Sequence, residues 1–115
     1  MSDTLYPRLS KELAKSRHDL APEIEDAFKQ FSKKVFEEGA LSAKAKQLIA
    51  VAVAHVTQCP YCIRGHTNAA SRDGATPEEI MEAIWVAAEM RAGGAYAHSA
   101  LALEAIAPKA GSGGA

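Results

Sequence analysis

Apolar residues recur along most of the chain at the three- and four-residue spacing of an α-helix, whereas the alternation typical of strands is nearly absent. The first clear segment starts with Pro22, which suits a first helical turn, and should end at Gly39. Its apolar positions recur at steps of four, three and four: Ile24, Phe28, Phe31 and Val35. This pattern predicts one amphipathic helix. Residues 1–20 are polar and mixed, so we expect a loosely structured segment with at most a short turn of helix at residues 9–14.

The middle of the chain is the most apolar part. Ser42 can cap a helix, and nearly every side chain in residues 48–56 is apolar. A helix that is apolar on all sides is surrounded by other helices. The β-branched residues here would also suit a buried strand, but Lys44 and Gln47 upstream, and the length of the segment from Ser42, favour a helix.

Prolines and glycines mark the next boundaries. Pro60 lacks an N–H and cannot continue a helix, so the preceding helix should end near Thr57 or Gln58. A new helix should begin with Pro60 in its first turn and run to about Ser71. Gly74 lies just beyond and is expected to stop it.

The C-terminal third is predicted to contain two helices. Thr76-Pro77-Glu78-Glu79 has the pattern of a capping box with proline at the first helical position, and it should start a helix through Met90. Gly93 and Gly94 are expected to break or kink the chain. A last helix should occupy residues 96–106, followed by a disordered tail at residues 108–115.

Length and composition limit the organisation to one domain. The chain has 115 residues, 48% of them hydrophobic, which is enough for one core, and we place the helical domain at residues 21–107. Several large apolar residues would remain exposed on so small a body, so self-association is expected to bury them: Phe28, Phe31, Phe36, Trp85 and Met90.

The charge balance excludes some partners. The net charge is -1, which offers no general attraction to nucleic acid or to anionic lipid. The N-terminus lacks the pattern of a secretory signal, and no apolar run approaches the roughly 20 residues that span a bilayer. We therefore expect a cytoplasmic protein without nucleic-acid or membrane partners.

The two cysteines carry the clearest chemical signal. In the reducing cytoplasm, a pair only three positions apart is expected to be catalytic or metal-binding. If Pro60 is the first helical residue, Cys59 is the N-cap and Cys62 lies in the first turn, where free N–H groups stabilise a thiolate. Cys62 and His66 are four apart on one helix face, so the imidazole can take the thiol proton. On this reasoning Cys62 should have the lower thiol pKa.

Three further residues are candidates for a proton relay. His55 precedes Cys59 by four positions, but the break at Pro60 leaves open whether it faces the thiols or the core. His98, after the double glycine, is equally open. Glu89 lies in an apolar segment, where it would either contact an imidazole or be solvated.

Zinc binding is the main chemical alternative, because Cys-x-x-Cys followed by His can hold zinc. On a single helix, residues 55–66 would span about 16 Å, too long for one tetrahedral ion. A second Cys-x-x-Cys is missing. We therefore expect neither a metal nor a cofactor.

Residues 41–54, 59–67 and 74–80 together resemble the core repeat of the alkylhydroperoxidase D-like, carboxymuconolactone decarboxylase superfamily. The similarity covers roughly residues 25–105, and its Cys-x-x-Cys-x-x-x-His element in an alanine-rich helical context is fairly specific. It implies an all-α helical bundle that assembles as a homotrimer or a homohexamer.

The resemblance also implies peroxidase or disulfide-reductase activity, which occurs in members that carry both cysteines. On that pattern Cys62 attacks the peroxide and becomes a sulfenic acid. Cys59 supplies a proton and then resolves the sulfenic acid as a disulfide, while His66 serves as base. The substrate would be a peroxide or a disulfide, and an external dithiol or protein reductase would restore the pair.

One position departs from the family pattern. Members often carry Glu twelve residues before the first cysteine, where Gln47 stands in this chain. An amide can hydrogen-bond an imidazole but cannot carry a proton or stabilise imidazolium by charge. Either His55, Glu89 or His98 takes over the relay, or disulfide exchange is the real task.

Two other functions stay open. One is a non-catalytic helical oligomer or a redox-sensing module, and a sensor would need a reactive thiol but not rapid proton delivery. The lactone decarboxylase branch of the superfamily generally lacks the cysteine pair, which disfavours that activity here.

Overall fold

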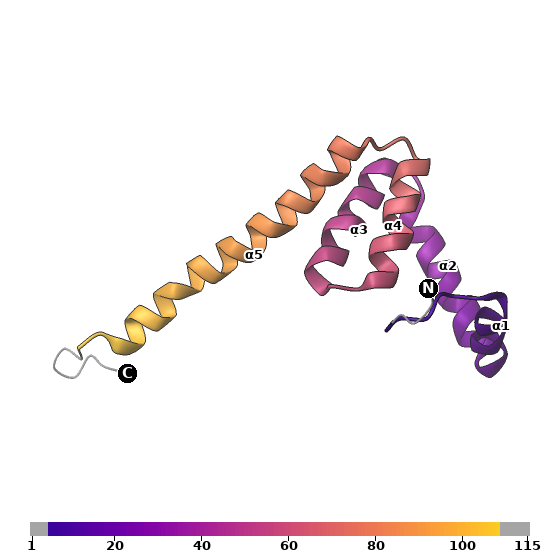
Figure 1. Cartoon of the computed structure of the whole chain (residues 1–115), viewed down its shortest axis with the longest axis horizontal. Coiled ribbons are helices and arrows are strands. Elements are labelled where there is room, and N and C mark those ends of the chain that lie inside the picture. The colour runs from indigo at the N-terminus through magenta and orange to yellow at the C-terminus, as the bar shows by residue number, and fades with distance from the viewer. Residues whose placement is uncertain (1–4, 109–115) are drawn as a thin grey trace.

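The computed structural model describes residues 5–108, and within them it contains helices and no strand, which confirms the predicted all-α class. The helices follow one another as α1 (Lys11–Leu20), α2 (Pro22–Phe36), α3 (Ala43–Thr57), α4 (Pro60–Arg72) and α5 (Pro77–Ile106). Figure 1 shows α3, α4 and the first part of α5 grouped together, while α1 and α2 lie to one side. The second part of α5 projects away from the group.

The helices around the cysteines form where the sequence predicted them. Ser42 caps α3, its Oγ accepting the N–H of Ala45 at 3.0 Å, and the strand alternative is wrong. α3 ends at Thr57, and Gln58 adopts the left-handed conformation with φ of 59°. Pro60 then opens α4. These boundaries matter because they place both thiols at the start of α4.

α5 begins as expected but does not break. The capping box is present: Thr76 Oγ1 accepts the N–H of Glu79 at 3.1 Å, and Glu79 Oε1 accepts the N–H of Thr76 at 2.9 Å. Lys44 from α3 lies 2.9 Å from the Glu79 carboxylate and, together with the Thr76 N–H, lowers the pKa of Glu79. The helix start is therefore tied to α3.

The predicted break at Gly93 and Gly94 is wrong, because α5 runs through both as one helix of 30 residues. Unlike proline, glycine keeps its N–H, and it costs only about 1 kcal/mol relative to alanine inside a helix. The surrounding residues 92–105 are rich in alanine, the strongest helix former. Two glycines in such a context weaken the helix without ending it.

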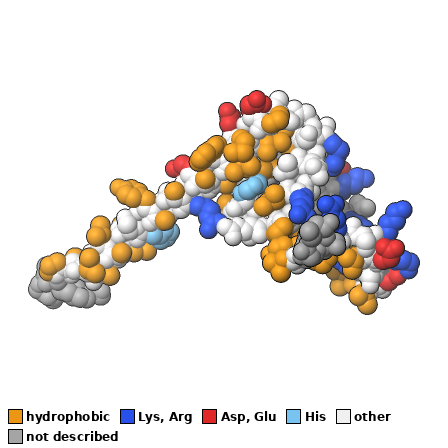
Figure 2. All heavy atoms as spheres, in the orientation of Figure 1, with side chains coloured by type: hydrophobic (Ala, Val, Ile, Leu, Met, Phe, Trp, Pro, Cys, Tyr) orange, Lys and Arg blue, Asp and Glu red, His pale blue; other side chains and the backbone are white. Residues whose placement is uncertain are grey.

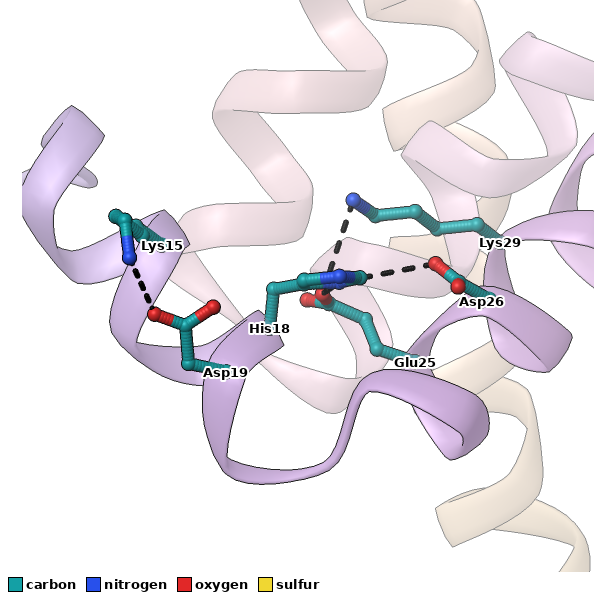
Figure 3. Close-up of polar contacts among 6 residues, drawn as sticks. All are labelled: Lys15, His18, Asp19, Glu25, Asp26 and Lys29. Atoms are coloured by element: carbon teal, nitrogen blue, oxygen red, sulfur yellow. Dashed lines mark hydrogen bonds and ion pairs between the residues drawn. The ribbon is translucent and has the colours of Figure 1, made fainter.

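The N-terminal part is more ordered than expected. α1 spans ten residues, capped by Ser10, whereas only a short turn at residues 9–14 was expected in a loosely structured segment. Figure 3 shows how α1 meets α2: the ring of His18 lies 2.8 Å from Glu25 and 3.7 Å from Asp26. α2 has the predicted apolar positions but ends at Phe36, three residues before Gly39. Most of the predicted disordered tail, residues 109–115, lies outside the described residues.

The core of the described chain is small. Val51, Ala70 and Ala75 are buried together, and partly buried residues of α3 and α5 pack against them: Leu48, Ile80 and Ile84. Within residues 5–108, the only other buried side chains are Ala54 and Ala87. None of the described helices combines the length and the apolar character that crossing a membrane requires. The core thus fixes α3, α4 and the start of α5, and these are the helices that carry the cysteine motif.

Candidate functional site

The cysteine pair lies at the N-terminus of α4. Cys59 is the N-cap, and its Sγ accepts the backbone N–H of Cys62 at 3.3 Å. The N–H of Cys59 donates to the carbonyl of Ala54 at 3.2 Å, which fixes the turn through Gln58 that leads into the motif. Both cysteines are free thiols; Cys59 is half-buried and Cys62 is exposed. The predicted placement of the two residues, as N-cap and first turn, is what the structure shows.

The two thiols differ in acidity, in the order opposite to the one expected. Hydrogen bonding from the Cys62 thiol, and then from the backbone N–H groups of Cys62 and Tyr61, lowers the pKa of Cys59. The same contact with Cys59, together with partial burial, raises the pKa of Cys62. The expectation that Cys62 has the lower pKa is therefore wrong in this geometry. The reason is that the N-cap sulfur receives the hydrogen bonds, whereas the first-turn sulfur donates one.

His66 is held by two residues from other helices. Its Nδ1 lies 2.8 Å from Gln47 Oε1 of α3. Because an amide oxygen only accepts, Nδ1 carries the proton and Nε2 keeps its lone pair. The ring of Phe36, the last residue of α2, stacks on the imidazole with centroids 5.2 Å apart and an interplanar angle of 28°. The tautomer and the orientation of His66 are thus both fixed.

Cys62 and His66 lie one turn apart on the same face of α4. His66 is half-buried, whereas the sulfur of Cys62 is open to solvent. The basic nitrogen of His66 is the one that does not face Gln47. This nitrogen, Nε2, can accept the proton of a thiol that lies on the same face of the helix.

The hydrogen bonds described for the other relay candidates do not lead to the thiols. The Nδ1–H of His55 donates to the carbonyl of Val51 at 2.8 Å, one turn back in α3. The Nδ1–H of His98 donates to the carbonyl of Gly94 at 2.7 Å, in the projecting part of α5. Glu89 is exposed and lies along Gly93 of its own helix, and no hydrogen bond from it to an imidazole occurs within residues 5–108. Of the four relay candidates, only Gln47 contacts a residue of the motif.

Three contributors to the site were not predicted. Phe36 was expected only as apolar surface to be covered, and no sequence signal marked its stacking on His66. Arg91 of α5 donates from Nη1 to the carbonyl of Val56 at 3.2 Å and so supports the end of α3 before the motif. Tyr61, between the cysteines, donates its hydroxyl to the carbonyl of Pro7 at 2.8 Å. Its position inside the motif was the available signal for a role at the site.

A groove lies beside Tyr61. It has a volume of about 430 Å3, and its lining is mainly apolar, with one guanidinium: Pro7, Leu9, Leu13, Arg17 and Tyr61. Tyr61 directly precedes Cys62 in the first turn of α4. The groove therefore meets the cysteine motif at Tyr61, and neither cysteine is among its lining residues.

The described residues do not provide a set of side chains that could bind one metal ion together. In the part of the chain that the structure describes, no three side chains among His, Cys, Asp and Glu are placed to hold one ion. The turn through Gln58 separates α3 from α4, and the ring of His55 bonds back along α3.

Comparison with known proteins agrees with this geometry. The sequence profile of the Carboxymuconolactone decarboxylase family matches residues 22–105. A protein of Paracoccus denitrificans, described as uncharacterized protein 4 in the cox locus, is 58% identical over 106 residues, which cover 92% of this chain and 95% of that one. A protein of Cupriavidus necator, also described as uncharacterized, is 41% identical over 83 residues, which cover 70% of this chain and 74% of that one.

Two solved structures have the same fold. A protein from Methanobacterium thermoautotrophicum superposes with a TM-score of 0.68 at 37% sequence identity, covering 72% of this chain and 93% of that chain. The other is apo-lpg0406, a carboxymuconolactone decarboxylase family protein from Legionella pneumophila. It superposes with a TM-score of 0.65 at 38% identity, covering 82% of this chain and 83% of that chain.

Proposed function

Since the chain belongs to the carboxymuconolactone decarboxylase family, as the resemblance of residues 41–54, 59–67 and 74–80 indicated, we propose that it is a thiol-dependent oxidoreductase that reduces a peroxide or a disulfide. The observation that carries the proposal is the pairing of two free thiols at one helix N-terminus with an oriented imidazole one turn later. Cys62 is the attacking sulfur because it is exposed and shares a helix face with His66. Cys59 is the resolving sulfur.

The first step oxidises Cys62. Counted from two protonated thiols, Nε2 of His66 takes the proton of Cys62, and the resulting thiolate attacks one oxygen of the peroxide. The S–O bond forms as the O–O bond breaks. The leaving alkoxide or hydroxide takes the proton of Cys59. The products are an alcohol or water and the sulfenic acid of Cys62.

The second step closes the disulfide. The Cys59 thiolate attacks Sγ of Cys62, so that the S–S bond forms and the S–O bond breaks. The departing hydroxide takes the proton held by His66 and leaves as water. Two electrons have then passed from the thiols to the peroxide, and an external dithiol or protein reductase returns two electrons and two protons. The low pKa of Cys59 suits this step, since its thiolate is the nucleophile.

Gln47 favours disulfide exchange over fast peroxide turnover. Its amide orients His66 but adds no negative charge, so the imidazolium that forms in the first step is less stabilised than beside a carboxylate. Attack on a disulfide follows the same order. Cys62 first forms a mixed disulfide with one half of the substrate and releases the other half as a thiol. Cys59 then attacks Sγ of Cys62 and displaces the bound half. The two protons end on the thiols released from the substrate.

Intact mass and turnover test the proposal together. Treatment with one equivalent of hydrogen peroxide should remove two hydrogens from the mass, and a dithiol should restore them. With excess dithiol, peroxide or a small disulfide should be consumed steadily. Cys62→Ser should abolish consumption, and Cys59→Ser should stop the reaction at the sulfenic acid of Cys62. A matched control is Ser71→Ala, which removes a hydroxyl from the far end of the same helix and should leave turnover unchanged.

A single stoichiometric oxidation without turnover, in the presence of a dithiol, would overturn the enzymatic proposal and identify a redox sensor. Near-stoichiometric zinc in protein purified without added metal, released on thiol modification, would overturn both.

A further inference from the structure

Within residues 5–108, the second part of α5 does not pack against the other helices (Figure 1). We call residues 95–106 the arm; every one of them is exposed, whereas Gly93 and Gly94 just before them are half-buried. Figures 1 and 2 show the arm projecting from the rest of the molecule with apolar side chains along it. The arm carries one charged side chain, Glu104, and one imidazole, His98. An isolated helix of this length and composition has little to stabilise it in water.

The arm has one continuous apolar stripe. Tyr96, Ala100, Leu103 and Ile106 recur at steps of four, three and three, which places them on one face of the helix. The three large side chains of this stripe are 81%, 63% and 77% exposed in chain order. Leu101 and His98 lie on the opposite face.

α2 presents a matching stripe at the other end of the molecule. Ile24, Phe28 and Phe31 recur at steps of four and three and are 74%, 62% and 64% exposed. The hydrogen bonds and the ring contact that tie α2 and the loop after it to α3 and α4 lie at its C-terminal end: Phe36 on His66, and Lys46 to the carbonyls of Val35 and Glu37. The stripe itself therefore faces solvent. Figure 1 shows α2 and the arm at opposite sides of the grouped helices.

The exposed area is too large for a chain that stays alone. The accessible surface is 9156 Å2, whereas a compact monomer of 12.2 kDa should expose about 6,000 Å2. The excess is about 3,000 Å2. Even if a third of it belonged to residues outside 5–108, the rest would be more than twice the roughly 800 Å2 that each partner buries in a standard stable interface. The radius of gyration, 20.6 Å against about 13 Å for a compact chain of this length, agrees.

We propose that the arm of one copy packs with its Tyr96–Leu103–Ile106 stripe against the Ile24–Phe28–Phe31 stripe of a second copy. The arm stripe is about three helical turns long and the α2 stripe about two, so one helix-on-helix contact can cover the α2 stripe and most of the arm stripe. Pairing arm with arm would leave the α2 stripe exposed and would require a second kind of contact. The near absence of charge on the arm suits the centre of an interface, where charged residues are depleted.

This contact joins two different surfaces, so it repeats from copy to copy and gives a closed ring when the rotation between successive copies closes. It also reaches the candidate site, because α2 ends in Phe36, the residue stacked on His66. An arm docked on α2 holds that helix, and with it the ring that orients the imidazole. The assembly is thus part of the site.

Paired charge insertions test the contact by light scattering after size-exclusion chromatography. Leu103→Glu on the arm and Phe28→Glu on α2 should each give monomers, while the wild type is larger than a dimer. Both positions are exposed in the single chain, so the helix content by circular dichroism should fall by no more than the share of the arm, and the other helices should persist. Leu101→Glu is the matched control: it makes the same change on the opposite face of the arm and should leave the assembly intact.

Mixing the two disrupted variants is the decisive part of the experiment. The Leu103→Glu chain keeps an intact α2 stripe, and the Phe28→Glu chain keeps an intact arm, so the mixture should form a heterodimer with one copy of each. A monomeric wild type, no heterodimer in the mixture, or a Phe28→Glu variant that still assembles would overturn the proposal. The last result would mean that arms pair with arms. Loss of assembly in Leu101→Glu equal to that in Leu103→Glu would show that the stripe is assigned to the wrong face.

Discussion

Three residues apart on one helix turn, Cys59 and Cys62 experience opposite environments because one sulfur accepts hydrogen bonds and the other donates. Replacing Cys62 by alanine removes the largest cause of the lowered pKa of Cys59, so that pKa should rise. Replacing Cys59 by alanine removes the contact that raises the pKa of Cys62, so that pKa should fall. Thiols alkylate as thiolates, so the pH midpoint of iodoacetamide reaction should move up in Cys62→Ala and down in Cys59→Ala.

Cys62→Ser serves as the control for this pair, because a hydroxyl can still donate to Cys59 Sγ and should leave part of the lowering in place. If the alkylation midpoint of Cys59 is the same with alanine, serine or cysteine at residue 62, the hydrogen bond between the thiols does not set its acidity.

Gln47 allows a second prediction at the scale of one residue. In Gln47→Glu, a carboxylate would accept the Nδ1–H of His66 in place of the amide oxygen. A hydrogen bond to a charged group is stronger by about 1 kcal/mol, and it would stabilise the imidazolium that forms as Cys62 loses its proton. Peroxide consumption with a dithiol should then rise about fivefold.

Gln47→Met, similar in size but unable to accept this hydrogen bond, should slow the same reaction. A rate in Gln47→Glu equal to that of the wild type would mean that proton removal by His66 does not limit turnover, and disulfide exchange should then be measured instead.

At the scale of the helices, the sequence predicted helix boundaries well where a residue is compatible with only one local structure. Pro60 is not compatible with a helix interior, which predicts the start of α4. The side chains of Thr76 and Glu79 accept each other's backbone N–H groups, which predicts the start of α5. Gly93 and Gly94 are compatible with either a break or a helix, because a helix tolerates glycine when alanines surround it. The helix therefore continued where a break was expected.

The candidate site likewise has features that the sequence could predict and features that it could not. The N-cap position of Cys59 follows from Pro60 alone, so it could be predicted. The pKa order could not, because it depends on which thiol donates to the other. Phe36 and Arg91 reach the site from helices distant in the sequence, and no local pattern specifies such contacts.

Gln58 provides a prediction for the junction of α3 and α4. Its φ of 59° lies in the left-handed region, which costs a residue with a side chain about 1 kcal/mol relative to glycine. Gln58→Gly should therefore stabilise the protein by up to about 1 kcal/mol, measured by urea unfolding at one fixed protein concentration. Gln58→Val, with a β-branched side chain, should destabilise it. Equal stability of all three would show that the turn is not held in this conformation in solution.

At the scale of the whole molecule, the small core gives the proposed contact between copies a consequence for stability. Val51 is the one large side chain among the five that are buried within residues 5–108, so little of the apolar surface of α2 and of the arm contributes to stability in a single copy. In the proposed assembly, those surfaces contribute to the free energy of folding through contacts between copies. Folding and assembly are then coupled.

Coupling of this kind makes the unfolding temperature depend on protein concentration. A partner that binds only the folded chain stabilises it in proportion to the logarithm of its concentration, so a hundredfold increase is worth about 2.7 kcal/mol per contact. For a chain of this size, that should raise the thermal midpoint by about 10 °C. Calorimetry over a dilution series of the wild type measures the shift, and the monomeric Leu103→Glu variant should show a lower midpoint that does not change with dilution. A wild-type midpoint independent of concentration would mean that each chain is stable by itself, and that the exposed stripes of α2 and the arm are covered in some other way.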